Sequence, residues 1–273
     1  MQQSYTKSFN HVILLMGLFI MIVPFWLIFA SSTHTSSIIN TQGLQFWIGD
    51  HFFENYDRVL NKKGGFFSEI TASRIFLNSF IMAVGVASIS VVTSLMAAYA
   101  IVYFKIKQAS LFFWLIFITL LVPLELRILP SYSVVSKLNL INSFTGLIIP
   151  ISASAIATFF FRQFYRSIPD ELLESAKLDG ANSWKFFIDF LLPLSKTMIA
   201  AMFIFMFVFG YNQYLWPIIM TTTEEYWTVV MGLKMMYGSL VDRFAYIVLS
   251  MIPPVLIVIF LQRWFIQGIF QNK

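Results

Sequence analysis

Residues 169–193 read PDELLESAKLDGANSWKFFIDFLLP, a charged insert between two long apolar runs at residues 145–161 and 197–219. Proline is favoured at the start of a helix, and acidic side chains in the first turn interact well with the helix dipole. Pro169 and the two acidic residues after it therefore predict the start of a helix. Gly180 is placed to end that helix, because glycine adopts a positive φ at low cost.

A second short helix is predicted to begin at Asn182 or Ser183 and to end before Pro193. Its pattern is expected to present three aromatic side chains: Trp184, Phe187 and Phe190. The wider segment 162–196 carries basic and acidic residues in equal number. Two short amphipathic helices joined by a tight turn make a compact knob, and such a knob can fit into a groove of another protein.

The rest of the chain is too apolar for a soluble domain of its length. Of 273 residues, 58% are hydrophobic, only 11% are charged, and 31 are phenylalanine. A membrane-spanning helix needs roughly 20 mostly apolar residues. The apolar runs predict an all-α membrane protein whose six transmembrane helices form a single domain over residues 1–273. The predicted spans are residues 11–30, 75–104, 109–123, 145–161, 197–219 and 245–265.

Two of these spans have distinctive ends. The first apolar run is longer than the core of a signal peptide, which is usually about 7–15 residues, and it contains Pro24. We therefore expect it to be kept as an anchor. The third run stops at Pro123, which predicts a broken helix near a membrane face. Residues 31–74 are polar and are predicted to form the longest extramembrane loop before the second span.

The basic residues act as topology signals. Lysine and arginine gather in cytoplasmic loops, and their distribution predicts that both termini and residues 162–196 are cytoplasmic. The net charge is +5, but the basic residues are scattered singly between apolar runs and form no basic patch with interleaved aromatic residues. This pattern argues against nucleic acid as a partner. The absence of cysteine excludes disulfides, thiol nucleophiles and thiolate metal sites.

The insert resembles the cytoplasmic EAA loop of ABC importer permeases, in which E-A-A is followed after three residues by G and after nine more by I-x-L-P. Five residues match in register: Glu174, Ala176, Gly180, Leu192 and Pro193. Ser175 replaces the middle alanine and Phe190 replaces the isoleucine. The resemblance implies that this loop docks into a nucleotide-binding subunit. The implied coupling residues are Glu171, Glu174, Ala176, Asp179, Gly180, Leu192 and Pro193.

Essentially the whole chain is similar to the second permease subunit of carbohydrate-type ABC importers, the group that contains the maltose permeases. The similarity is strongest to the branch that imports sn-glycerol 3-phosphate, and it rests on residues 111–120, 122–130, 157–164, 169–172, 193–197 and 211–217. It implies an inner-membrane permease for sn-glycerol 3-phosphate or glycerophosphodiesters, with a neutral sugar or oligosaccharide as the alternative. The implied partners are a second, homologous permease in a heterodimer, a pair of ATPase subunits and an extracytoplasmic solute-binding protein.

Polar and aromatic side chains near the outer end of the fifth span are candidates for the translocation path: Asn212, Gln213, Tyr214 and Trp216. Polar side chains at bilayer depth tend to face a cavity or another helix. The amides can bond hydroxyl groups, and the aromatic rings can stack on a polyol. The alternative is that the aromatic residues anchor the interface and the amides bond neighbouring helices.

Glu125 and Arg127 follow Pro123, where the third span is expected to reach the outer face. A guanidinium offers a phosphate two parallel hydrogen bonds, so Arg127 is a candidate partner for an anionic solute. Glu125 is a candidate to hold Arg127 in place. The alternatives are a solvated ion pair or a contact with the solute-binding protein.

Several chemistries have no pattern in the sequence. No G-x-x-x-x-G-K-[ST] loop occurs, so ATP and Mg are expected to be bound by the partner ATPase, with no cofactor in this chain. His11, His34 and His51 form neither H-E-x-x-H nor another metal-binding spacing, and no catalytic residue is predicted. A secondary transporter would show charged relays and internal repeats, and a membrane-embedded enzyme would show clustered acids or histidines. Neither pattern stands out.

Overall fold

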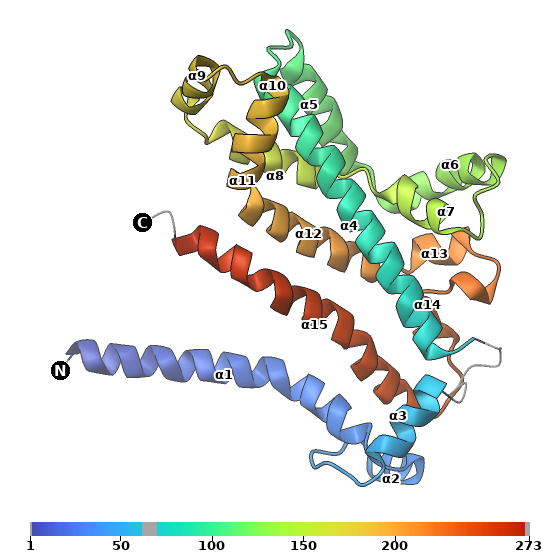
Figure 1. The fold of residues 1–273 in the computed structure, drawn as a ribbon. Helices are drawn as coiled ribbons and strands as arrows, with labels where there is room; N and C mark the ends of the chain where they lie inside the picture. The colour runs from blue at the N-terminus through green and yellow to red at the C-terminus, as the bar shows by residue number, and fades with distance from the viewer. Residues whose placement is uncertain (1, 62–69, 271–273) are drawn as a thin grey trace. The chain divides into compact units, whose positions relative to one another are not determined.

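The computed structural model describes residues 2–61 and 70–270, and all regular elements in these ranges are helical. Figure 1 shows the helices as a ribbon coloured along the chain. The chain forms two compact units. Unit 1 contains residues 1–76 and 232–252, and unit 2 contains residues 77–231 and 253–273. Two long helices, α4 (Ala72–Tyr103) and α15 (Leu240–Phe270), contribute residues to both units.

Unit 1 begins with the longest uninterrupted apolar helix of the amino-terminal region. Its elements are α1 (Gln2–Ser31), α2 (Ser36–Gln42), α3 (Phe52–Asn61), and the first parts of α4 and α15. None of the most apolar window of α1 is buried inside the protein, as expected of a helix whose neighbours are lipids. The polar stretch after α1 contains two short helices, α2 and α3, which were not predicted from the sequence.

Unit 2 is a set of shorter helices around the remainder of α4. In chain order they are α5 (Ala109–Ile118), η1 (Thr119–Leu121), α6 (Leu124–Lys137), α7 (Phe144–Ile148), η2 (Ile149–Ile151), α8 (Ala155–Arg166), α9 (Asp170–Leu178), α10 (Ser183–Lys185), η3 (Phe186–Leu191), α11 (Leu192–Leu194), α12 (Lys196–Tyr211), α13 (Leu215–Met220), η4 (Glu224–Tyr226) and α14 (Val229–Met235). The end of α15 completes the unit, and α14 extends past its boundary.

Three helical stretches are long and apolar enough to cross a membrane: Phe9–Ser31, Ala72–Tyr103 and Leu240–Arg263. Three further helix pairs pass the same test together but are sharply bent at a short break. The described residues therefore contain between three and six spans, depending on whether each bent pair crosses once. The predicted six spans correspond to the upper figure.

The break predicted at Pro123 is present. The helix of α5 and η1 ends at Leu121, and α6 leaves at an angle of 105°. Proline restricts the residue before it to extended conformations, and Val122 has φ −89° and ψ 108°. The turn into α6 therefore follows from the sequence, although α6 itself was not predicted.

The fourth and fifth predicted spans are not continuous helices. The fourth breaks after Ile151 and resumes at Ala155 with a 48° bend, where Ser154 Oγ accepts a hydrogen bond from the Ala157 amide at 3.1 Å. The fifth ends at Tyr211 and resumes in α13, which contains Pro217. A proline ring collides with the carbonyl four residues earlier in a helix, so one helix cannot pass through this point undistorted.

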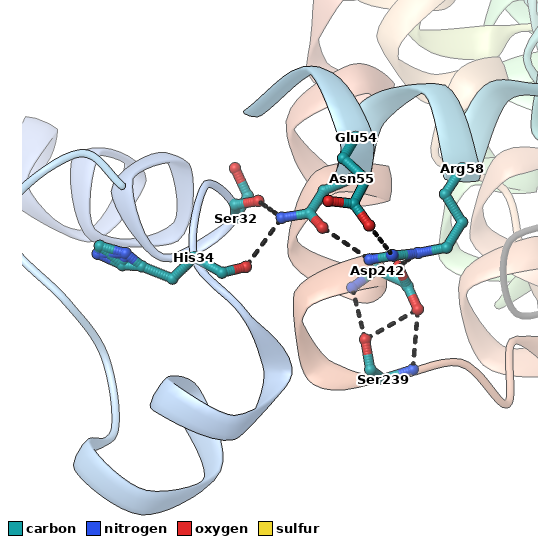
Figure 2. A network of polar contacts seen from close by, with 7 residues as sticks. All are labelled: Ser32, His34, Glu54, Asn55, Arg58, Ser239 and Asp242. Atoms are coloured by element: carbon teal, nitrogen blue, oxygen red, sulfur yellow. Dashed lines mark hydrogen bonds and ion pairs between the residues drawn. The ribbon is translucent and has the colours of Figure 1, made fainter. Parts of the chain in front are cut away.

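A network of polar contacts ties the first extramembrane loop to the start of α15 within unit 1 (Figure 2). Arg58 Nε donates to Asp242 Oδ1 at 2.8 Å, and Arg58 Nη2 donates to Asn55 Oδ1 at 2.7 Å. Asn55 Nδ2 then donates to the carbonyls of Ser32 and His34, both at 2.9 Å. We refer to these contacts as the Arg58 network. They join residues that are 184 positions apart in the sequence.

Candidate functional site: the EAA loop and a cavity among broken helices

The EAA loop, residues 162–196, begins with a helix that starts and stops where its sequence predicts. Helix α9 runs from Asp170 to Leu178 after Pro169, with Asp170 and Glu171 in its first turn. It ends in a Schellman turn: the Ala181 amide donates to the Ala176 carbonyl at 2.9 Å, and the Gly180 amide donates to the Lys177 carbonyl at 3.0 Å. Gly180 has φ +76°, which confirms the reason for a glycine at this position.

The second helical piece of the loop starts as predicted but presents different residues. Asn182 Oδ1 accepts from the Lys185 amide at 2.8 Å and caps α10. The expectation that Phe187 is presented is wrong, because only 4% of its surface is exposed, whereas Trp184 is 60% exposed. The wider turn of the π-helix η3 carries Phe186 and Phe187 into the interior. Phe190 is half-buried.

An apolar cluster holds the loop against α4, α8 and α12 within unit 2. It is formed by Val91, Leu95, Ala98, Tyr99, Ala157, Phe161, Tyr165, Ala176, Phe186, Phe187, Leu191 and Met202. Tyr99 also donates its hydroxyl proton to the Ser183 carbonyl at 2.6 Å. Small residues such as Ala98 and Ala157 let the helices approach closely. The loop is therefore packed onto the helices, which makes it suited to transmit a displacement.

The predicted coupling residues divide between the packed and the open face of the loop. Ala176 is buried in the apolar cluster, and Leu192 is half-buried. The others are exposed: Glu171, Glu174, Asp179, Gly180 and Pro193. Four exposed apolar side chains that were not among the predicted coupling residues lie on the same loop: Leu178, Trp184, Ile188 and Leu194. A leucine among charged neighbours in α9 was the available signal for the first of them.

Beside the end of the loop lies an apolar cavity of about 520 Å³. Its lining is Leu192, Pro193, Lys196, Ile199, Ala200, Phe203 and Leu261, all within unit 2. Lys196 is the one charged residue in that lining. Leu192 and Pro193 of the EAA pattern therefore line this apolar cavity in addition to forming the end of the loop.

A second cavity, of about 280 Å³, lies in unit 2 where the broken helices meet. We call it the break cavity. Its lining comes from the α5–α6 break, the η2–α8 break, α12 and α13: Thr119, Leu120, Val122, Pro123, Arg127, Ser131, Pro150, Ile151, Ala153, Ser154, Ala155, Ile156, Phe205, Met206, Phe209 and Trp216. Within a membrane, non-helical backbone is tolerated where it is buried in protein or lines a polar cavity. Broken helices also build the substrate sites of many transporters.

The break cavity brings together two of the six predicted path residues, Arg127 and Trp216. Trp216 is only 1% exposed, and its indole N–H donates to the Leu147 carbonyl at 3.1 Å, so its polar group serves packing. The other four predicted residues do not line this cavity: Glu125, Asn212, Gln213 and Tyr214. The side-chain amide of Gln213 donates through Nε2 to the Phe209 carbonyl at 3.2 Å, which is a contact within its own segment.

The expectation that Glu125 holds Arg127 is not met. Residues two apart in a helix point to different sides, and only Arg127 reaches the cavity. Within residues 2–61 and 70–270, Arg127 makes no ion pair. Arg127 is exposed and lies in the lining of the cavity.

The chemistry of the break cavity favours an anion. Arg127 is its one charged lining residue, and Thr119, Ser131 and Ser154 contribute hydroxyl groups. The first turn of α8, at Ala155 and Ile156, also lines it. The first amides of a helix lack intrahelical partners and carry partial positive charge. These three hydroxyl residues were not predicted from the sequence; Ser154, which caps α8 at a helix break, had a local signal, whereas Ser131 lies inside α6.

A metal site has no support in the part of the chain that the structure describes, because no three His, Cys, Asp or Glu side chains gather there. The two candidate surfaces are therefore the exposed face of the EAA loop and the break cavity.

Comparisons with known proteins identify the family of the chain. Residues 90–271 match the family described as binding-protein-dependent transport system inner membrane component. The sn-glycerol-3-phosphate transport system permease protein UgpE of Brucella melitensis is 38% identical over 278 residues, covering 100% of this chain and 99% of the relative. The protein of the same name from Yersinia pestis bv. Antiqua is 40% identical over 271 residues, covering 97% of this chain and 96% of the relative.

The fold also has a solved counterpart. A bacterial ABC transporter involved in the import of the acidic polysaccharide alginate contains a chain that superposes with a TM-score of 0.81. The alignment covers 97% of this chain and 98% of that chain at 22% identity. A likeness at this identity establishes the fold alone.

Proposed function

The chain belongs to the binding-protein-dependent transport system inner membrane components, and from this premise we propose that it carries sn-glycerol 3-phosphate or a glycerophosphodiester across the inner membrane. It is a permease of the ABC importer type, a multi-pass membrane protein that works with an ATPase and a solute-binding protein. The relatives at 38–40% identity are named for transport of sn-glycerol 3-phosphate over nearly the whole chain. These names support the substrate proposal.

The observation that carries the substrate proposal is the position of Arg127 in the break cavity. A phosphate monoester bears up to two negative charges, and a guanidinium binds its oxygens through two parallel hydrogen bonds. The hydroxyls of Ser131 and Ser154 suit the polar glycerol part of the solute. A neutral sugar would not need the guanidinium.

The EAA loop is the proposed link to ATP hydrolysis. Its exposed face, with Glu171, Glu174, Asp179 and Gly180, would dock on an ATPase subunit that binds ATP and Mg. A second, homologous permease would complete the membrane pathway, and both termini of this chain would face the cytoplasm. When the ATPase subunits close, the loop would transmit their movement to α4, α8 and α12, against which its apolar cluster packs. That movement would open the break cavity alternately to each side.

The substrate proposal is tested by ATPase stimulation in the reconstituted importer. The cognate binding protein is loaded with sn-glycerol 3-phosphate or with a maltose-type sugar, and wild type is compared with Arg127→Ala and Arg127→Lys. We expect stimulation by the phosphate, loss of that stimulation in Arg127→Ala, and partial rescue by lysine, which retains the charge but not the paired hydrogen bonds. Stimulation by sugar alone would leave the permease and overturn the phosphate assignment.

The coupling proposal is tested at Gly180. A Cβ atom built on Gly180 meets no neighbouring atom of this chain within 4 Å, so a bulky residue there disturbs chiefly the docking face. Any side chain at this position also meets the backbone strain of φ +76°. Gly180→Ala controls for that strain, because it adds a Cβ with little bulk. We expect Gly180→Trp to abolish substrate-stimulated ATPase activity and Gly180→Ala to retain most of it. Full activity in Gly180→Trp would show that this face does not couple.

A further inference from the structure

In unit 1, the chain between α2 and α3 folds back along the end of α1 (Figure 1). We call residues 44–48 the fold-back segment. Gly43, with φ +76°, ends α2 and donates its amide to the Ile39 carbonyl at 3.0 Å. This left-handed residue turns the chain into the segment, at a position where glycine has the least strain.

Hydrogen bonds to α1 and its end fix the fold-back segment. The Trp26 indole N–H donates to the Phe46 carbonyl at 2.9 Å, and the Gln45 amide donates to Ser31 Oγ at 2.9 Å. Just beyond the segment, the Gly49 amide donates to Thr33 Oγ1 at 2.7 Å. The segment is thus held from both of its ends, and several of its polar backbone groups are already satisfied.

The position of Trp26 sets the depth of the segment. Trp26 lies within the apolar window Phe9–Ser31 and precedes the end of that window by five residues, which is about 7.5 Å of helix. The Phe46 carbonyl that it binds therefore lies beside the last turns of a candidate membrane span. A segment at that level borders the interfacial region of the bilayer.

Four of the five side chains of the segment are apolar and exposed, and the fifth, Gln45, is half-buried. Leu44, Phe46, Trp47 and Ile48 are all exposed, Trp47 by 77%. No Asp, Glu, Lys or Arg occurs between Ser31 and Asp50, so entry into the interface desolvates no charge. Tryptophan is enriched at membrane interfaces, where its ring has an apolar body and a polar edge.

We propose that the fold-back segment is a lipid anchor, whose Phe46, Trp47 and Ile48 side chains insert into the bilayer interface beside the end of α1. The segment lies beside a candidate membrane span, because Trp26, whose indole binds the Phe46 carbonyl, belongs to the stretch Phe9–Ser31. The Arg58 network joins the same loop to the start of α15. The anchor therefore holds the Arg58 network at a fixed height above the membrane.

The chain has no cysteine, so single cysteines can be introduced for spin labelling without removing a native one. The complete importer is reconstituted in vesicles of phosphatidylethanolamine and phosphatidylglycerol, with Ile48→Cys as the reporter and Leu44→Cys as a second one. Asp50→Cys is the water reference, and Leu14→Cys, on the exposed surface of α1, is the lipid reference. Wild-type complex treated with the same label measures the background from partner subunits. Stimulated ATPase activity confirms that each labelled complex is folded.

The measured quantity is the collision rate of the spin label with oxygen divided by its collision rate with a water-soluble nickel complex. We expect this ratio to be several-fold higher at residues 48 and 44 than at residue 50, and to approach the ratio at residue 14. A ratio equal to that at residue 50 would place the segment in water and overturn the proposal. Exclusion of both reagents would mean that another protein covers the segment, and this would overturn it as well. None of these outcomes depends on which solute the importer carries.

Discussion

The EAA loop and the first extramembrane loop are both fixed to long helices, but by different kinds of contact. The EAA loop is held by buried aromatic and small side chains, with Phe186, Phe187 and Ala176 at the centre. The first loop is held by the Arg58 network, in which charged and amide groups bond one another and backbone carbonyls (Figure 2).

The kind of contact determines how each loop responds to substitution of its side chains. Apolar packing has no preferred direction, so a loop held by apolar packing is destabilised more by loss of side-chain volume than by small changes of orientation. A polar network depends on the geometry of each partner, and removing one partner leaves another buried and unpaired. We therefore expect the EAA loop to be sensitive to truncation of its buried side chains and the first loop to be sensitive to single-atom changes.

The largest effect is expected from truncation in the packed loop. Phe187→Ala removes a side chain that is almost fully buried in the apolar cluster and should destabilise unit 2 by about 3–5 kcal/mol. Trp184→Ala is the matched control on the same helical segment, because its ring is mostly exposed. Its ring stacks on that of Phe187 at a centroid distance of 5.7 Å, so the control should cost only about 0.5–1.5 kcal/mol. Thermal unfolding of the detergent-purified complex measures both, and equal losses would contradict the observed division of the two rings.

A smaller loss is expected when the ion pair of the Arg58 network is broken. Asp242→Asn keeps acceptors for the Ser239 contacts but removes the charge that faces Arg58. The side chains of Arg58 and Asp242 are 35% and 10% exposed, so the cost is discounted from that of a fully buried pair to about 1–3 kcal/mol.

Glu54→Gln is the matched control for the same guanidinium. Glu54 lies 3.7 Å from Arg58 and is largely exposed. Exposed pairs contribute about 0–1 kcal/mol, so this variant should resemble wild type in thermal unfolding. If Glu54→Gln is as destabilised as Asp242→Asn, the network is not organised around Asp242.

The same contrast explains how far the sequence could be interpreted. The start and stop of α9 depend on local signals, Pro169, the acidic first turn and Gly180, and each behaves as predicted. The burial of Phe187 depends on a π-helical turn, for which a helical period of 3.6 residues gives no warning. The break near Pro217 follows from a clash with a preceding carbonyl. Pro217 predicts the end of the fifth span, and the helix ends six residues earlier, at Tyr211.

Long-range contacts were beyond the sequence. Nothing near Arg58 or Asp242 indicates that residues 184 positions apart form a pair. The break cavity likewise depends on three helix breaks that meet in space, and only Arg127 and Trp216 were predicted among its lining. Interpretation of single segments can locate breaks and caps, but the partners of each break are set by tertiary packing.

An intermediate effect is expected at Asn55, the amide of the Arg58 network. Asn55→Ala removes the donors to the Ser32 and His34 carbonyls and the acceptor for Arg58. Leaving such buried groups unpaired costs about 1–3 kcal/mol, and the lower half is expected here because Arg58 can be reached by water. Asn61→Ala is the matched control, since Asn61 is exposed at the other end of α3, where its side-chain amide donates to Asp57 Oδ1. Equal thermal stability of Asn55→Ala and Asn61→Ala would contradict a structural role for the network.

The smallest effect is a pH dependence at Tyr56, whose hydroxyl lies 2.8 Å from Ser32 Oγ. Burial raises the pKa of Tyr56 above its ordinary value, although the contact with Ser32 opposes the shift. Because the folded state favours the protonated hydroxyl, this contribution to stability is fully present below about pH 10 and is lost as the pH rises through the raised pKa. Tyr56→Phe has no proton to lose, so its unfolding temperature should fall less steeply than that of wild type above about pH 10. The difference between the two profiles cancels the titration of the other tyrosines, and identical slopes would mean that the hydroxyl is not buried in the folded loop.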